Sequence, residues 1–272
     1  MLAYWVHQLD PFMVRFPPGC FVEGIRWYGC AYFLGFWVAW LTLSIYTHHR
    51  MLALSPEQQQ ALLFYLLLGI LVGGRLGYVL LYDFPYYLHH PQQIIEFWKG
   101  GMSSHGGFVG AYVALLGLSR KYKLCLYSLA DLVVCLVPMG IFFGRLANFV
   151  NAETVGRITD VPWAVLFPNN PFPRHPSQLY EALGEGIGLF IWTQVSIWKT
   201  RCVQTFPGKL TGAILVYYGF VRILLECFRE PDASLILGIS RGQFYSIFLA
   251  LVGILLVRHA NGRISTNNVF KP

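Results

Sequence analysis

The residues best suited to chemistry lie in one stretch that begins inside an apolar segment. Between residues 140 and 157 the chain carries Arg145, Asn148, Asn151, Glu153 and Arg157. A charge at the centre of a bilayer costs about 2.5–3.5 kcal/mol on insertion scales, so it usually faces a polar cavity or a partner. We therefore expect Arg145 and Asn148 to line a functional cavity rather than merely to end a helix.

A second polar group follows helical spacing later in the chain. Tyr218, Arg222 and Glu226 are each four residues apart, so they share one helix face. Arg222 and Glu226 could form a purely structural ion pair. Alternatively, Arg222 and Arg145 could face one cavity, where two guanidinium groups would suit the phosphate of an anionic lipid headgroup.

Further polar residues border the apolar segments. His105 lies among glycines in the stretch 101–107, and its usual pKa near 6.5 suits a general base at neutral pH. A lone histidine at a helix start is more often a cap or an interfacial hydrogen-bonding group, so both readings stay open. The other candidates are Tyr28, Arg75, and the pair Glu181 and Glu185, which could face one cavity.

Composition indicates the solvent that surrounds these groups. The chain has 272 residues, of which 56% are hydrophobic and only 12% are charged, whereas soluble domains average about 25% charged residues. Several apolar runs approach the roughly 20 residues that cross a bilayer as a helix. The fold class is therefore an all-α polytopic membrane protein with about seven transmembrane helices and a small outer-side head region; continuous apolar runs disfavour a β-barrel.

The charge and the cysteines exclude other classes. A formal charge of +7 fits a protein at an anionic lipid surface, and no nucleic-acid-binding motif is present. The six cysteines have no ligand spacing with histidines. We expect no metal, no cofactor and no nucleic-acid partner.

Apolar runs and basic residues predict the topology. Spans are expected at about 25–46, 61–82, 103–118, 126–143, 179–198, 210–227 and 243–257, the fourth short and broken by Pro138. Residues 1–24 form an interfacial arm, 25–258 the catalytic domain with outer loops at about 83–101, 145–177 and 228–242, and 259–272 a cytoplasmic tail. Basic residues at alternate span ends put the N-terminus outside and the C-terminus in the cytoplasm.

Glycines recur four residues apart in several spans. The pairs and triplets are Gly69, Gly73 and Gly77; Gly106 and Gly110; Gly140 and Gly144; Gly184 and Gly188. Small residues at this spacing let helix backbones approach closely in lipid. Plain helix packing is the expected role of these glycines.

Five motifs, taken together, resemble one protein family. They are Gly-Gly-Arg-Leu-Gly-Tyr at 73–78, Gly-Met-Ser-Ser-His-Gly-Gly at 101–107, Gly-Arg-Leu-Ala-Asn-Phe-Val-Asn-Ala-Glu at 144–153, Arg-His-Pro-Ser-Gln-Leu-Tyr-Glu at 174–181, and the stretch from Arg222 to Asp232. In this order, over about residues 25–245, they resemble the bacterial prolipoprotein diacylglyceryl transferases. Two departures are Ala152, where the signature commonly has glycine, and the short segment Pro168–Arg174.

The resemblance implies an activity and a set of site residues. The reaction transfers a diacylglyceryl group from phosphatidylglycerol to the lipobox cysteine of a prolipoprotein signal peptide, in the bacterial cytoplasmic (inner) membrane, and releases glycerol phosphate. The implied catalytic residues are His105, Arg145, Tyr28 and Arg222, with His105 or Tyr28 as the base for the thiol. The implied substrate-binding residues are Arg145, Asn148, Glu153, Gly156, Tyr218, Arg222 and Glu226. The alternative function is a transporter or binding protein for an anionic lipid or solute.

Overall fold

The computed structural model describes residues 4–17, 19–20, 23–96, 100–200, 202–231, 235, 238–260 and 268–270. Asp232, the last residue of one family motif, lies outside the described residues. The chain forms two compact units. The first unit holds residues 1–45 and 131–264, and the second holds residues 46–130 and 265–272.

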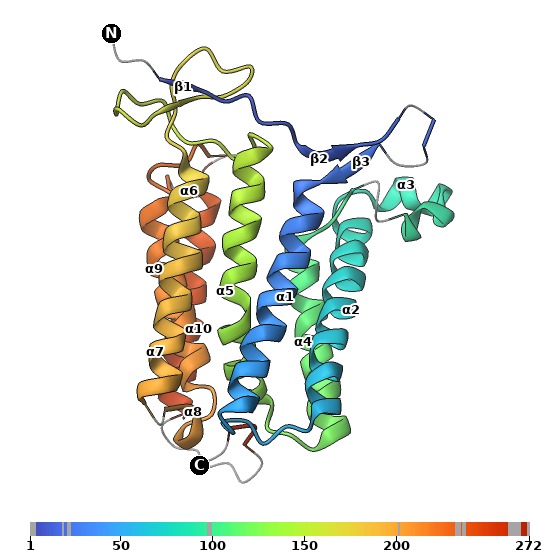
Figure 1. Cartoon of the computed structure of the whole chain (residues 1–272), viewed down its shortest axis with the longest axis vertical. Coiled ribbons are helices and arrows are strands. Elements are labelled where there is room, and N and C mark those ends of the chain that lie inside the picture. Colours follow the sequence, from blue (N-terminus) through green and yellow to red (C-terminus); the bar gives the residue numbers. More distant parts are fainter. Residues whose placement is uncertain are drawn as a thin grey trace. The chain divides into compact units, whose positions relative to one another are not determined.

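The first unit is built from long helices. They are α1 (Trp27–His48), α5 (Leu126–Val150), α9 (Lys209–Leu225) and α10 (Arg241–Ala260). The boundaries between the two units fall inside α1 and α5. A further long element runs without interruption through α6 (Ser177–Glu181), the π-helical segment η3 (Ala182–Gly188) and α7 (Leu189–Lys199), and the short helix α8 (Cys202–Thr205) follows it. In Figure 1, α9 and α10 lie side by side along their length.

Glycines allow the helices of this unit to touch through their backbones. A Cβ atom on Gly212 of α9 would come within 2.7 Å of the carbonyl oxygen of Gly253 on α10. A Cβ on Gly35 of α1 would lie 3.0 Å from the Cα of Gly140 on α5, and one on Gly186 of η3 would lie 2.6 Å from the Cβ of Phe142. Gly144 differs, because nothing lies within 4 Å of its Cβ position, so packing does not explain that glycine.

A buried carboxylate starts α9. Asp131 of α5 is fully buried and accepts hydrogen bonds from the backbone amides of Gly208 and Thr211, both at 2.7 Å, and from the Thr211 hydroxyl at 2.6 Å. The first amides of a helix have no partner within the helix, so a carboxylate there satisfies them and complements the helix dipole. Asp131 therefore fixes where α9 begins and, with it, the register of Tyr218 and Arg222.

Four short strands depart from the all-α prediction. Strand β1 (Trp5–Val6) pairs in parallel with β4 (Val165–Leu166), and β2 (Phe12–Arg15) pairs antiparallel with β3 (Gly24–Arg26). Three of the four strands lie in or next to the segment 1–24, where an arm was expected. An arm that crosses no bilayer core can leave its edges to water, so short strands are permitted there.

The second unit centres on two helices in backbone contact. Helix α2 (Pro56–Leu81) begins with a capping box, in which Ser55 and Gln58 satisfy each other's backbone amides. It packs along α4 (Ser104–Tyr122), as Figure 1 shows. A Cβ on Gly110 would lie 1.9 Å from the oxygen of Gly69, and one on Gly106 would lie 2.2 Å from that of Gly73. Both glycine sets therefore do pack helices, as expected.

Two short helices and the end of the chain complete this unit. Helix α3 (Phe84–His89) and the 3₁₀ helix η1 (Pro91–Ile95) lie where a loop or short helix was expected. The expected C-terminal tail is not free in its described part. The Val269 carbonyl accepts from the Ala53 amide at 2.7 Å, the Val269 amide donates to the Ser128 hydroxyl at 3.1 Å, and Val269 and Phe270 are buried.

All seven expected spans are helical in the described residues, but their bounds and apolarity differ. In the part of the chain that the structure describes, four helices (α1, α2, α5 and α10) are long and apolar enough to cross a membrane by length and composition. The expectation that the fourth span breaks at Pro138 and ends at 143 is wrong, because α5 continues to Val150. Pro138 itself is buried, and in a membrane helix the groups of neighbouring helices can offset the one backbone hydrogen bond that a proline removes. The loop expected from residue 145 therefore begins after Val150.

The glycine contact between α2 and α4 generates a stability prediction. The variant Gly110→Val places a branched side chain against the Gly69 carbonyl and forces the helices apart, so the thermal midpoint of the purified protein in detergent should fall markedly. The control is Gly117→Ala on the same helix, where nothing lies within 4 Å. That variant should be neutral or up to about 1 kcal/mol more stable, because alanine favours the helix. Equal effects of the two variants would contradict the backbone contact.

Candidate active site

A network of buried ion pairs lies where α5, α6, η3 and α9 meet in the first unit. Arg145 of α5 contacts Glu181 through Nη1 and Glu185 through Nη2, both at 2.9 Å. Arg222 of α9 contacts the same two carboxylates, Glu181 at 2.5 Å and Glu185 at 3.2 Å. It also pairs with Glu226 one turn later, at 2.7 Å. The two glutamates therefore bridge two arginines from different helices.

Arg229, after the end of α9, adds a third guanidinium, with Nη1 3.5 Å from Glu181. Among the described residues, the network thus contains three arginines and three glutamates, whose formal charges cancel. Removing one partner of such a buried pair typically costs about 3–5 kcal/mol, because it leaves an uncompensated charge.

Burial distinguishes the members of this network. The side chains of Glu181 and Glu185 are fully buried, and that of Arg222 is 10% exposed. The Arg145 side chain is 19% exposed, the largest fraction among the six. Arg145 is therefore the cation that a ligand reaches most readily.

A second polar cluster follows Arg145 on α5. The Asn148 side-chain amide donates to the Glu153 carboxylate at 3.0 Å and makes a short contact with the Tyr28 hydroxyl. That hydroxyl donates to the same carboxylate oxygen at 3.0 Å. Residues from α1, α5 and the turn after α5 thus meet at one point, and Arg145 interacts electrostatically with Tyr28. The two clusters are neighbours.

Tyr218 completes the face that the spacing predicted on α9. Its phenol lies within electrostatic range of Arg145, Arg222, Glu181 and Glu185. The structure therefore brings together Tyr28, Arg145, Asn148, Glu153, Tyr218, Arg222 and Glu226 in one unit, seven of the nine residues that the resemblance implies.

Gly156, the eighth, is a crossing point of three segments. The Gly156 amide donates to the His175 carbonyl at 3.1 Å, and the Gly156 carbonyl accepts from the Arg174 side chain at 2.9 Å. A Cβ here would lie 2.3 Å from the His175 oxygen and 2.7 Å from that of Phe228. Close approach, not a left-handed turn, explains this glycine. The left-handed backbone occurs at Ala152, with φ 54°, and at Thr154, with φ 51°.

His105, the ninth, belongs to the second unit. It lies exposed in the first turn of α4, where Ser103 caps the helix by accepting from the Gly106 amide at 3.2 Å. Its role as a base remains a prediction.

Arg75, also in the second unit, has a structural role. Its guanidinium donates to the backbone carbonyls of Gln93, Ile94, Gly100 and Gly101 at 2.6 to 3.0 Å. It therefore holds the segment after α3.

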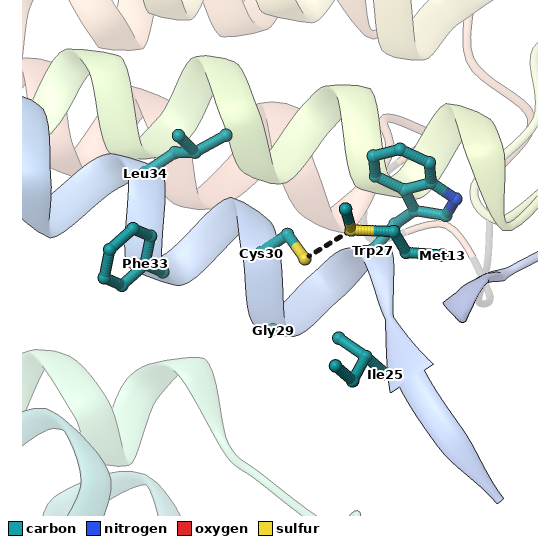
Figure 2. Close-up of a pocket in the computed structure, with 7 residues that line it drawn as sticks. All are labelled: Met13, Ile25, Trp27, Gly29, Cys30, Phe33 and Leu34. Atoms are coloured by element: carbon teal, nitrogen blue, oxygen red, sulfur yellow. Dashed lines mark hydrogen bonds between the residues drawn. The ribbon is translucent and has the colours of Figure 1, made fainter. Parts of the chain in front are cut away.

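An apolar cavity of about 440 Å³ lies beside α1 (Figure 2). Its lining residues are Met13, Ile25, Trp27, Gly29, Cys30, Phe33 and Leu34. The Cys30 thiol contacts the Met13 sulfur at 3.4 Å. Helical geometry puts Tyr28 on roughly the opposite face of α1 from Cys30 and Phe33. This cavity suits hydrocarbon and is separate from the ion-pair network.

The sequence did not reveal how central Glu181 and Glu185 are. Their spacing suggested a shared face, but their partners Arg145 and Arg222 lie about 40 residues away along the chain. The buried Gln178, which donates to the Glu153 backbone carbonyl at 2.6 Å, was also missed. The signal that could have found it is its place in the motif at 174–181, three residues before Glu181.

Apolar helices around a buried, charge-balanced arginine–glutamate network define a helical membrane protein with a polar site on its helices. Comparison with known proteins identifies the group. The family model for prolipoprotein diacylglyceryl transferase matches residues 20–259, so the chain belongs to this family. The resemblance predicted from the motifs is confirmed.

Individual relatives agree over nearly the whole chain. Phosphatidylglycerol–prolipoprotein diacylglyceryl transferase of Shewanella oneidensis is 39% identical over 265 residues, covering 94% of this chain and 97% of the relative. The proteins of the same name from Rhodospirillum rubrum and Nitrosospira multiformis are each 42% identical, covering 91% and 92% of this chain and 91% and 86% of the relatives.

The left-handed alanine beside the site generates a prediction. Ala152→Gly should raise the stability of the protein by up to about 1 kcal/mol, because the left-handed conformation costs an L-residue about 1–2 kcal/mol and glycine nothing. Thermal unfolding in detergent measures the change. The control Ala147→Gly, in the buried interior of α5, should lower the midpoint instead. A lower midpoint for Ala152→Gly would contradict the strain.

Proposed function

We propose that this chain transfers the diacylglyceryl group of phosphatidylglycerol to the thiol of the lipobox cysteine of a prolipoprotein. Family membership supports the reaction, and the names of the relatives supply both substrates. The observation that carries the site assignment is Arg145, a partly accessible guanidinium inside an otherwise buried network. The chain is accordingly a transferase, and the membership favours this over a transporter.

The reaction exchanges one bond at a glyceryl carbon. The thiol sulfur forms a bond to the carbon that bears the phosphate, and the bond from that carbon to the phosphate oxygen breaks. The electron pair of the broken bond stays on the phosphate, which leaves as glycerol phosphate, and the thiol proton passes to a base. The products are a thioether-linked diacylglyceryl group and a phosphate with one more negative charge.

Arg145 and Arg222 are the groups that stabilise that charge. A guanidinium binds phosphate oxygens through two parallel hydrogen bonds, and these fixed donors stabilise the charge that develops on the oxygens they contact. Arg145 offers the accessible guanidinium. Arg222 pairs with Glu226, which aligns it, and contacts the same two glutamates as Arg145.

The Tyr28–Asn148–Glu153 cluster binds the polar part of the lipid. Asn148 presents an amide one turn after Arg145 on α5, and Tyr28 presents a hydroxyl from α1. Both groups contact Glu153, which orients them. These groups suit the hydroxyls of a glycerol headgroup. Gly156 and Tyr218 border the same site. His105 or Tyr28 takes the proton of the thiol, which has an ordinary pKa near 8.5 and needs activation.

The membrane topology is part of the proposal. Seven helices span the cytoplasmic membrane of a bacterium, with the N-terminus outside and the C-terminus in the cytoplasm, and the segment 1–24 lies along the outer surface of the bilayer. Residues 25–258 form the catalytic domain, with an outer head built from the loops. The basic residues at alternate span ends support this orientation.

The variant Arg145→Lys tests the phosphate assignment. It keeps the positive charge beside Glu181 and Glu185 but loses the two-pronged geometry, so transfer should fall about 10²–10³-fold. Arg145→Ala should abolish transfer. Membranes with phosphatidylglycerol labelled in the diacylglyceryl group and a synthetic lipobox peptide measure the movement of label onto cysteine.

The control is Arg15→Lys, a substitution of the same type at an arginine that is 60% exposed and pairs with Asp10. Its transfer rate should stay at the wild-type level. Near-normal turnover of an inserted Arg145→Ala protein would remove Arg145 from the mechanism. Solute movement without labelled peptide would favour the transporter instead.

Substitution distinguishes the two candidate bases. If His105 is the base, His105→Gln loses most of the transfer activity, whereas Tyr28→Phe keeps most of it. Retained activity of His105→Gln with an unchanged pH profile of transfer would assign His105 to positioning and leave Tyr28 as the base.

A further inference from the structure

Two buried carboxylates in the ion-pair network have no part in the proposed chemistry. Glu181 and Glu185 are both fully buried, and each contacts both Arg145 and Arg222 within 3.2 Å. A carboxylate in that position competes with any anionic ligand for the same guanidinium donors. The positive charges of Arg145 and Arg222, to which we assign phosphate binding, are thus already paired with carboxylates.

This neutralisation sets how strongly the site attracts anions. A site of two or three uncompensated arginines in a low dielectric would hold a phosphate tightly. Here the three carboxylates cancel the field, so a phosphate gains mainly from direct hydrogen bonds to Arg145. Repulsion from the buried glutamates grows with each additional negative charge on the ligand.

Substrate and product differ in charge at this point. The lipid phosphodiester carries a single negative charge, whereas the released phosphomonoester has a second ionisation near pH 6 and carries about −1.5 to −2 at pH 7. A balanced site therefore tolerates the diester better than the monoester.

We propose that Glu181 and Glu185 are positioning residues that hold Arg145 and Arg222 and limit their affinity for phosphate, so that the site binds the diester and releases the monoester product. The inference rests on the proposed function. It assigns the release of a phosphorylated product to carboxylates that themselves touch neither substrate.

The local backbone supports a dedicated placement of these two side chains. Glu181 ends α6, and Glu185 lies in the π-helical segment η3. Residues four apart lie next to each other on one face of a helix, so the two side chains project in similar directions. Both carboxylates thereby contact the same two guanidinium groups.

The test is Glu185→Gln, which removes one negative charge and keeps the shape and one oxygen acceptor for Arg145. Inhibition by added glycerol phosphate should become at least about tenfold stronger, because one arginine charge is left uncompensated. Multiple-turnover kcat should fall and the KM for phosphatidylglycerol should fall with it, while the first turnover keeps a larger share of its rate.

Three further variants make the result specific. Glu185→Asp keeps the charge and should bring product inhibition back toward the wild-type value. Glu230→Gln removes a carboxylate that pairs with Arg174 and is 52% exposed, outside the network; its product inhibition should not change. Glu226→Gln removes a network charge at a less buried position, and it should also tighten product binding even if Glu185→Gln fails to fold.

Unchanged or weaker product inhibition in folded Glu185→Gln and Glu226→Gln would overturn the inference. Calorimetric binding of glycerol phosphate to the purified wild-type and variant proteins needs no transfer reaction. Tighter binding by the variants with no transfer by the wild type would therefore refute the proposed function and keep the charge-balance inference. Transfer by the wild type, together with equal binding of glycerol phosphate by the wild type and the variants, would support the proposed function and refute the charge-balance inference.

Discussion

The pairing of buried arginines with buried glutamates is the interaction on which the rest of the site depends. Charges of either sign are expensive among apolar helices unless they are paired and hydrogen-bonded. Glu181 and Glu185 each contact guanidinium groups from two helices, so the network cross-links α5, the α6–η3 segment and α9 as it neutralises them. The same contacts that make the charges tolerable also fix where they lie. The geometry of the candidate site thus follows from the electrostatic requirements of the fold.

Close helix packing holds the elements that carry this network. Gly186 of η3 lies against Phe142 on α5, one turn before Arg145, and Gly212 lies against Gly253 between α9 and α10. At the other end of α9, Asp131 satisfies the first amides of the helix. The close backbone contacts at these glycines and the Asp131 cap at the start of α9 oppose small shifts of the helices along their axes. An arginine must hold its oxygen partners within a few tenths of an ångström, and these contacts supply that rigidity.

Spacing in the sequence predicted what is local and failed on what is distant. The interval of four between Arg222 and Glu226 correctly predicted a pair on one face, and the apolar runs correctly predicted a mostly helical chain. The motifs identified the family. The partners of Arg145 could not be predicted, because Glu181 and Glu185 lie about 40 residues away and reach it only through tertiary packing. The prediction that Pro138 breaks a helix was wrong, since neighbouring helices can offset the loss of one backbone hydrogen bond. The strands near the N-terminus are too short to show an alternating pattern.

Arg75 holds the segment 93–101 through contacts that do not depend on the side chains of that segment. All its hydrogen bonds in the described residues go to main-chain oxygens of the segment 93–101, and none goes to a side chain there. Every amino acid presents the same carbonyl, so this segment can exchange most of its side chains and remain tethered. Arg75 itself cannot be exchanged in this way, because a lysine has one charged nitrogen and cannot bind four carbonyl oxygens at once. A single position in α2 thereby permits sequence drift across a whole loop.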